Sequence, residues 1–250
     1  MTGTVTPATP TFNRGTGTSG SRLVGIVALL ALAWTAVFGL FISPADDVQG
    51  EAVRFLYLHV PAVMCAYLGF ALCALGSVMV LRRRSMGWDR FAGASAELGV
   101  LFMAITLVTG SLWGNKTWGV YWTWDARLTT SALLFFMFLG YLAVRRLDAS
   151  PEAGARRSAI VGIISAANIP IVNRSVSWWR SLHQGSTFAR TNVDMDGLML
   201  FTTFVGVGAF VVLFAWLLIH RLRALELTDL VARRGLDQAI AERVAESVRA

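Results

Sequence analysis

Aromatic and charged residues gather in one stretch of the sequence, residues 113–129, which we call the tryptophan segment. It holds four of the nine tryptophans in the 250 residues and ends in an Asp-x-Arg pair. Aromatic rings suit a flat apolar ligand, and an arginine can hold its carboxylates through charge-assisted hydrogen bonds. The candidate binding residues are Trp113, Trp118, Tyr121, Trp122, Trp124, Asp125 and Arg127.

The shape of the tryptophan segment stays open at this point. Trp118, Trp122 and Asp125 share a face if it is helical, whereas Trp118, Trp122 and Trp124 share one if it is extended. An aromatic belt is the alternative for any single tryptophan, because tryptophan and tyrosine collect at membrane interfaces whatever the protein does. For Arg127 the alternatives are a pair with Asp125 or a lipid headgroup. The interleaved glycines and the Asp-x-Arg pair favour a binding surface.

Two of the three histidines are candidate metal ligands. His59 and His183 lie in or beside segments expected on the side of the tryptophans, whereas His220 ends the last apolar stretch on the other side. Without acidic or thiolate companions two histidines make a poor zinc site, but haem iron takes its other four ligands from the porphyrin. Haem is also an apolar disc with two carboxylates, so the pattern favours haem with His59 and His183 on the iron. The alternative for each histidine is a helix cap or a packed side chain.

Long apolar stretches must position these residues. Hydrophobic residues make up 55% of the chain and charged residues 15%, and the mean hydropathy is +0.59. A membrane-spanning helix needs about 20 apolar residues. The stretches that meet or approach this length are 23–42, 60–81, 92–112, 128–144, 158–172 and 198–219. The sequence therefore predicts an all-α integral membrane protein with about six transmembrane helices.

Arginine and lysine residues predict the orientation of these helices. The net charge of +7 comes from residues at the ends of the apolar stretches, so it does not indicate a nucleic-acid-binding face. With both termini in the cytoplasm, 16 of the 22 Lys and Arg residues fall on the inner side. This asymmetry follows the positive-inside rule. Segments 44–58, 113–127 and 174–197 are then expected on the outer side of the cytoplasmic (inner) membrane, in contact with membrane lipid.

The composition along the chain predicts three regions. Residues 1–21 are rich in Thr, Gly, Ser and Pro and are expected to form a disordered cytoplasmic tail. Residues 22–220 form the membrane domain, and the charged residues 221–250 form a cytoplasmic helix or tail. The short inner loops leave no room for an ATPase domain, so any ATP hydrolysis belongs to a partner.

Three motifs together resemble the CcmC family of cytochrome c maturation proteins, haem-handling membrane proteins marked by a tryptophan-rich outer loop, the WWD domain. The resemblance covers roughly residues 22–220. The motifs are Trp-Gly-x-x-x-Trp-Gly-x-x-Trp-x-Trp-Asp-x-Arg-Leu-Thr at 113–129, Leu-His-Val-Pro-Ala at 58–62 and Trp-Trp-x-x-Leu-His-Gln-Gly at 178–185.

This resemblance implies a six-helix bundle that holds haem b non-covalently at the outer face, with His59 and His183 as axial ligands. It also implies a haem-handling role without catalysis by this chain. Haem would pass to the membrane-anchored chaperone CcmE. The implied neighbours are the single-span protein CcmD and an ABC transporter of CcmA and CcmB, whose ATP hydrolysis releases the loaded chaperone.

Two other functions fit parts of the sequence. A haem lyase-like subunit would attach haem directly to apocytochrome thiols. A permease would use Glu97 and Asn168 in a channel, with the tryptophans as a belt, and would be indifferent to loss of the histidines.

Overall fold

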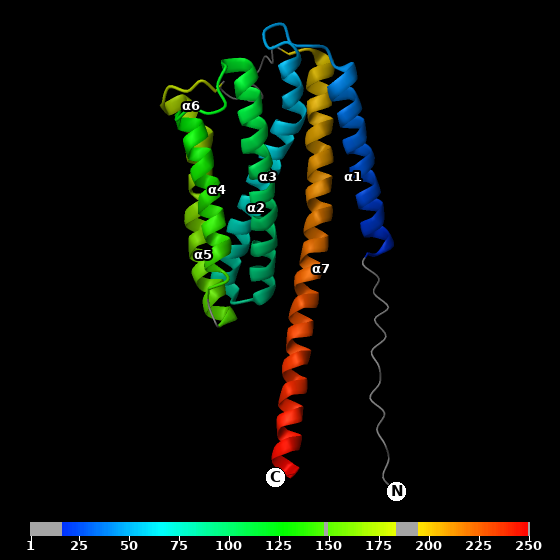
Figure 1. The fold of residues 1–250 in the computed structure, drawn as a ribbon, viewed down its shortest axis with the longest axis vertical. Helices are drawn as coiled ribbons and strands as arrows, with labels where there is room; N and C mark the ends of the chain where they lie inside the picture. The colour runs from blue at the N-terminus through cyan, green and yellow to red at the C-terminus, as the bar shows by residue number, and fades with distance from the viewer. Residues whose placement is uncertain (1–16, 148–149, 184–194, 250) are drawn as a thin grey trace.

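The computed structural model describes residues 17–147, 150–183 and 195–249. Its helices lie side by side in a bundle, with α2 and α3 between the α1–α7 pair and the group of α4, α5 and α6 (Figure 1). The elements are α1 (Ser19–Val37), the π-helix η1 (Phe38–Ile42), the 3₁₀-helix η2 (Glu51–Phe55), α2 (Leu56–Arg83), α3 (Met86–Trp118), α4 (Ala126–Val144), α5 (Pro151–Ala166), α6 (Asn168–Trp178) and α7 (Gly197–Arg249).

Within the described residues, six helical stretches are long and apolar enough to cross a membrane, which confirms the predicted fold class. They are Ser19–Ile42, Glu51–Arg83, Met86–Trp118, Ala126–Val144, Pro151–Trp178 and Gly197–Gln238. Because this number is even, the start of α1 and the end of α7 lie at the same end of the bundle. We call this the inner end, following the charge asymmetry, and the opposite end the outer end.

The fifth span is two helices rather than one. Helices α5 and α6 meet at Ala167, just before Asn168 and Pro170. Pro170 has no backbone N–H to bond the preceding turn, which explains the break. The Asn168 side-chain amide donates to the Thr130 carbonyl of α4 at 3.1 Å, so this polar group is satisfied inside the bundle.

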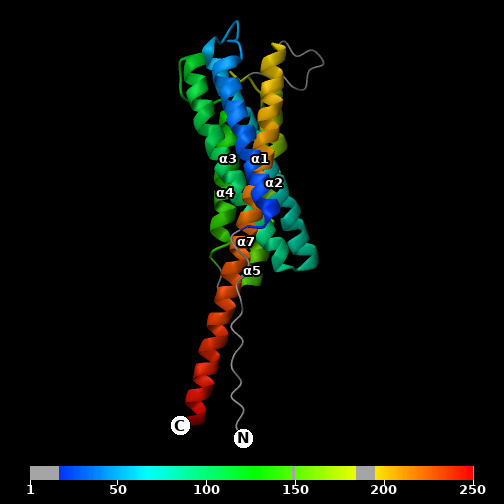
Figure 2. The ribbon, with the colours of Figure 1, turned by 90° about the vertical axis from the view of Figure 1, so that its right-hand side faces the viewer.

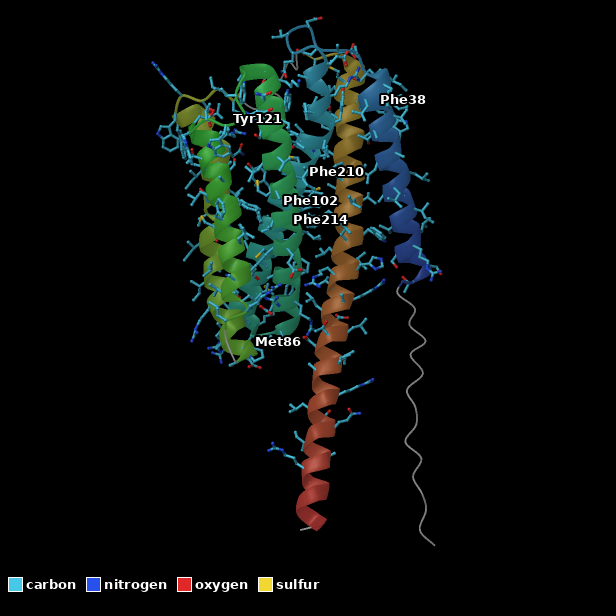
Figure 3. The ribbon with its side chains drawn as sticks, in the orientation of Figure 1. Phe38, Met86, Phe102, Tyr121, Phe210 and Phe214 are labelled. Atoms are coloured by element: carbon cyan, nitrogen blue, oxygen red, sulfur yellow. The ribbon has the colours of Figure 1, made fainter. Side chains whose placement is uncertain are left out.

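Small residues allow close packing at the centre of the bundle. A Cβ atom on Gly69 of α2 would lie 2.8 Å from the Gly99 Cα of α3, so the two backbones touch there. Phe70 of α2 stacks on Phe138 of α4 with ring centroids 3.9 Å apart. Phe102 of α3 meets two phenylalanines of α7; Figure 3 labels this group, which comprises Phe102, Phe210 and Phe214.

Ion pairs join the inner halves of the helices. Asp89 of α3 pairs with Arg145 after α4, and Glu97 of α3 pairs with Arg221 of α7. Helix α7 continues past the other helices at the inner end (Figure 2). Residues 221–249, predicted as a helix or tail, are therefore one helix with the last span. Of the predicted tail 1–21, residues 1–16 lie outside the described residues, and α1 begins at Ser19 behind the cap Thr18.

Candidate functional site

The predicted site residues lie at the outer end of the bundle, on the helices α2, α3 and α4 and on two connections between helices. His59 is in the first turn of α2, and Trp113 and Trp118 are in the last turns of α3. Arg127 begins α4, and His183 follows α6. Residues from distant parts of the sequence therefore meet at one end of the molecule.

The tryptophan segment is helical in its first part and irregular in its second. Helix α3 ends at Gly119, whose φ of 76° is left-handed and favours glycine. Trp122 and Trp124 follow in the non-helical connection, where their ring centroids are 5.7 Å apart at 82°. Neither of the two shapes considered from the sequence describes the whole segment.

Each candidate histidine lies beside a tryptophan of α3. The ring centroids of His59 and Trp113 are 5.7 Å apart, and those of His183 and Trp118 are 6.2 Å apart. Both pairs meet edge to face. An electrostatic interaction also links His59 with His183 and with Arg127. The two imidazoles thus lie near each other at the outer end of the bundle, each beside its own tryptophan.

Asp125 joins the tryptophan segment to the segment that carries His183. Its Oδ1 accepts a hydrogen bond from the Leu128 backbone N–H at 2.8 Å and so caps α4. Its Oδ2 accepts from the Ser181 hydroxyl at 2.8 Å and from the Leu182 N–H at 3.2 Å. The Ser181 hydroxyl in turn accepts from the His183 N–H at 3.1 Å. A single carboxylate therefore determines where the backbone of His183 lies.

We expect Asp125→Ala to release the backbone of residues 181–183. Each hydrogen bond to a charged group contributes about 1.5–3 kcal/mol, so the loss of two should raise local opening more than tenfold. Tryptic cleavage after the exposed Arg180, measured in nanodiscs, should accelerate by at least that factor. The matched control is Asp196→Ala, which removes a carboxylate cap from α7 but no contact with Ser181. Equal cleavage rates for the two variants would contradict the role of Asp125 in holding the backbone of His183.

Three buried polar atoms of the tryptophan segment are suited to a ligand. Trp122 Nε1, Thr123 Oγ1 and Arg127 Nε have no hydrogen-bond partner among the described residues. Buried donors are nearly always paired, so such a group indicates a site for an acceptor. Arg127 also donates from Nη2 to the Asn173 carbonyl at 3.3 Å, which holds its guanidinium between α4 and α6. Carboxylates of a bound molecule would satisfy these donors.

Two other aromatic residues of the segment face away from the bundle. Trp124 is 83% exposed and Tyr121 is 59% exposed. Tyr121 lies near the outer end in Figure 3, and its carbonyl accepts from the Ser111 hydroxyl at 2.7 Å. These rings are open to a ligand edge, to lipid or to a partner protein.

Sequence reasoning missed several residues around the site. Thr109 and Gly110 of α3 contact the His59 ring, and Gln49 accepts a hydrogen bond from Trp113 Nε1 at 2.8 Å. The available signal was the helical spacing of Thr109 and Trp113, which places them one turn apart on the same face. No local pattern indicated Gln49.

Comparisons with known proteins complete the description. A family model described as CcmC, Heme exporter protein C, matches residues 5–236. Heme exporter protein C of Haemophilus influenzae is 33% identical over 223 residues, covering 89% of this chain and 90% of that protein. Heme exporter protein C of Escherichia coli K12 is 34% identical over 225 residues, covering 85% and 89%. A putative cytochrome c biosynthesis ccmC-like mitochondrial protein of Marchantia polymorpha is 36% identical over 188 residues, covering 75% and 79%.

Proposed function

The chain belongs to the Heme exporter protein C family, and on that premise we propose that it binds haem b at the outer face of the cytoplasmic membrane and delivers it to CcmE during c-type cytochrome maturation. CcmD and the transporter subunits CcmA and CcmB are the proposed neighbours in the complex. The chain itself breaks and forms no covalent bond, and ATP is hydrolysed by the transporter.

The observation that carries the proposal is the position of two imidazoles at the outer end of the bundle, each beside a tryptophan. His59 and His183 come from helices and loops far apart in the sequence, yet each lies against a tryptophan of α3. A haem ligated by two histidines requires two imidazoles, an apolar surround and donors for its propionates. The unpartnered Trp122 Nε1 and Arg127 Nε supply donors of the last kind.

In this proposal each residue has a separate task. His59 and His183 bind the iron, while Trp113, Trp118 and Trp122 cover the porphyrin. Arg127 and the Trp122 indole N–H hold the propionates, and Asp125 keeps His183 in place. The exposed rings of Tyr121 and Trp124 leave one edge of the site open, which suits a cargo that must be handed to another protein.

Haem transfer between purified proteins tests the function. The full chain, CcmA, CcmB, CcmD and full-length CcmE are reconstituted in liposomes with haem and ATP, and covalent haem on CcmE is followed by peroxidase staining of denaturing gels. We expect labelled CcmE only when this chain is present. In a parallel reaction with apocytochrome in place of CcmE, labelled apocytochrome would support the lyase instead. No haem spectrum and no labelled CcmE would overturn the proposal.

A further inference from the structure

The hydroxyl of Thr109 determines which nitrogen of His59 carries a proton. Thr109 Oγ1 donates to the carbonyl of Ile105 at 2.7 Å, with the Thr106 carbonyl at 3.2 Å as a second acceptor. Its single proton is used there, because a carbonyl oxygen can only accept. The His59 Nδ1, 3.1 Å from the same Oγ1, must therefore donate to it. This leaves Nε2 of His59 unprotonated, with its lone pair free to bind a metal.

The neighbouring Gly110 provides the space in which the His59 ring lies. A Cβ atom at this position would be 2.8 Å from the His59 Cε1, closer than real Cβ contacts, and 3.3 Å from its Nδ1. The glycine lets the imidazole rest directly on the backbone of α3. Trp113, one turn further along α3, packs edge to face against the imidazole, with the two ring centroids 5.7 Å apart.

We propose that Thr109 and Gly110 are positioning residues for haem: together they hold the His59 imidazole in one tautomer and one orientation, with Nε2 presented to the iron. This inference rests on the proposed function, because it assumes that His59 is an axial ligand. Thr109 is only 6% exposed, so water does not readily replace its hydroxyl. Neither residue needs to touch the haem.

Two measurable consequences follow. Mutation of a residue that hydrogen-bonds the non-ligating nitrogen of a ligand histidine typically lowers metal affinity by roughly 10–100-fold. Thr109→Val should therefore release haem faster by a factor in that range. The hydrogen bond to Nδ1–H also makes Nε2 more basic, which favours ferric iron. Its loss should move the midpoint potential of the bound haem to a more positive value.

The experiment compares four variants in nanodiscs at saturating haem, by absorption spectrum, haem release to apomyoglobin and redox titration. Thr109→Val removes the acceptor at nearly constant volume, and Thr109→Ser restores it. Gly110→Ala should displace the imidazole and weaken the low-spin spectrum. The matched control Thr106→Val removes an equally buried hydroxyl one turn away, which donates to Phe102 of its own helix, and keeps the Thr106 backbone carbonyl that also interacts with His59.

The inference holds if Thr109→Val shows faster release and a more positive potential while Thr109→Ser and Thr106→Val stay within about threefold of the wild type. It is overturned if Thr109→Val matches the wild type in both, or if Thr109→Ser fails to restore them. Failure of the proposed function looks different, because His59→Ala would then leave the wild-type spectrum unchanged.

Discussion

Replacing either His59 or His183 with alanine is expected to abolish the six-coordinate low-spin haem spectrum of the purified chain. An iron held by two imidazoles loses one of its two protein ligands in each variant, and the porphyrin alone has no replacement for it. Absorption spectra of the oxidised and reduced protein measure the loss directly. Haem that remains should be five-coordinate and more easily removed.

Added imidazole separates loss of a ligand from loss of the fold. The small molecule should enter the space left by either side chain and restore the low-spin spectrum, which it would not do in a collapsed protein. His220→Ala is the control, because His220 packs against Trp216 with ring centroids 5.1 Å apart and lies near Gly17, at the inner end of the bundle. Wild-type spectra in both outer histidine variants would refute the two-histidine site.

Replacing Asp89 with alanine should destabilise the bundle by about 3–5 kcal/mol, because it leaves the Arg145 guanidinium without its partner. The Asp89 side chain is 6% exposed and that of Arg145 is 20% exposed. Two hydrogen bonds join them, at 3.2 Å from Nε and 2.5 Å from Nη2. The guanidinium also packs on Gly93, which limits its escape to water. Equilibrium unfolding in mixed detergent micelles measures the difference.

Two further variants test the reason for this loss. Asp89→Leu combined with Arg145→Met removes both charges and should recover most of the stability, since burial of an ion pair gains little over an apolar pair. Glu51→Gln breaks the pair of Glu51 with Arg54 at the outer end, where the Glu51 side chain is 70% exposed, and should cost less than about 1 kcal/mol. Similar losses in Asp89→Ala and Glu51→Gln would contradict the role of burial.

These two predictions concern opposite ends of the molecule. Asp89 and Arg145 lie at the inner end of α3 and α4, whereas His59 and His183 lie at the outer end. We therefore expect the folded fraction of Asp89→Ala to retain the wild-type haem spectrum. The histidine variants should in turn unfold at nearly the wild-type detergent concentration when haem is absent.

The sequence by itself determined the six spans and predicted that the candidate site residues share one end of them. Apolar stretches reveal membrane helices because a lipid bilayer offers no hydrogen bonds to an exposed backbone, so length and hydropathy suffice. The charge asymmetry then predicted that His59, His183 and the tryptophan segment share one side of the membrane. Even the break at Ala167 was foreseeable, because Pro170 lacks the donor that a continuous helix needs.

Only the tertiary structure decided how these residues meet. It ended α3 at Gly119 within the tryptophan segment, placed His59 against Thr109 fifty residues away, and joined Asp125 to Ser181 across 56 residues. It also paired Glu97 with Arg221, whereas the permease alternative had placed Glu97 in a channel. Such contacts depend on the angle and register of packed helices, which arise from small residues such as Gly69 and Gly110 fitting against particular neighbours. Local patterns report the faces and ends of each helix, whereas the partner of each face is set by how all the helices pack together.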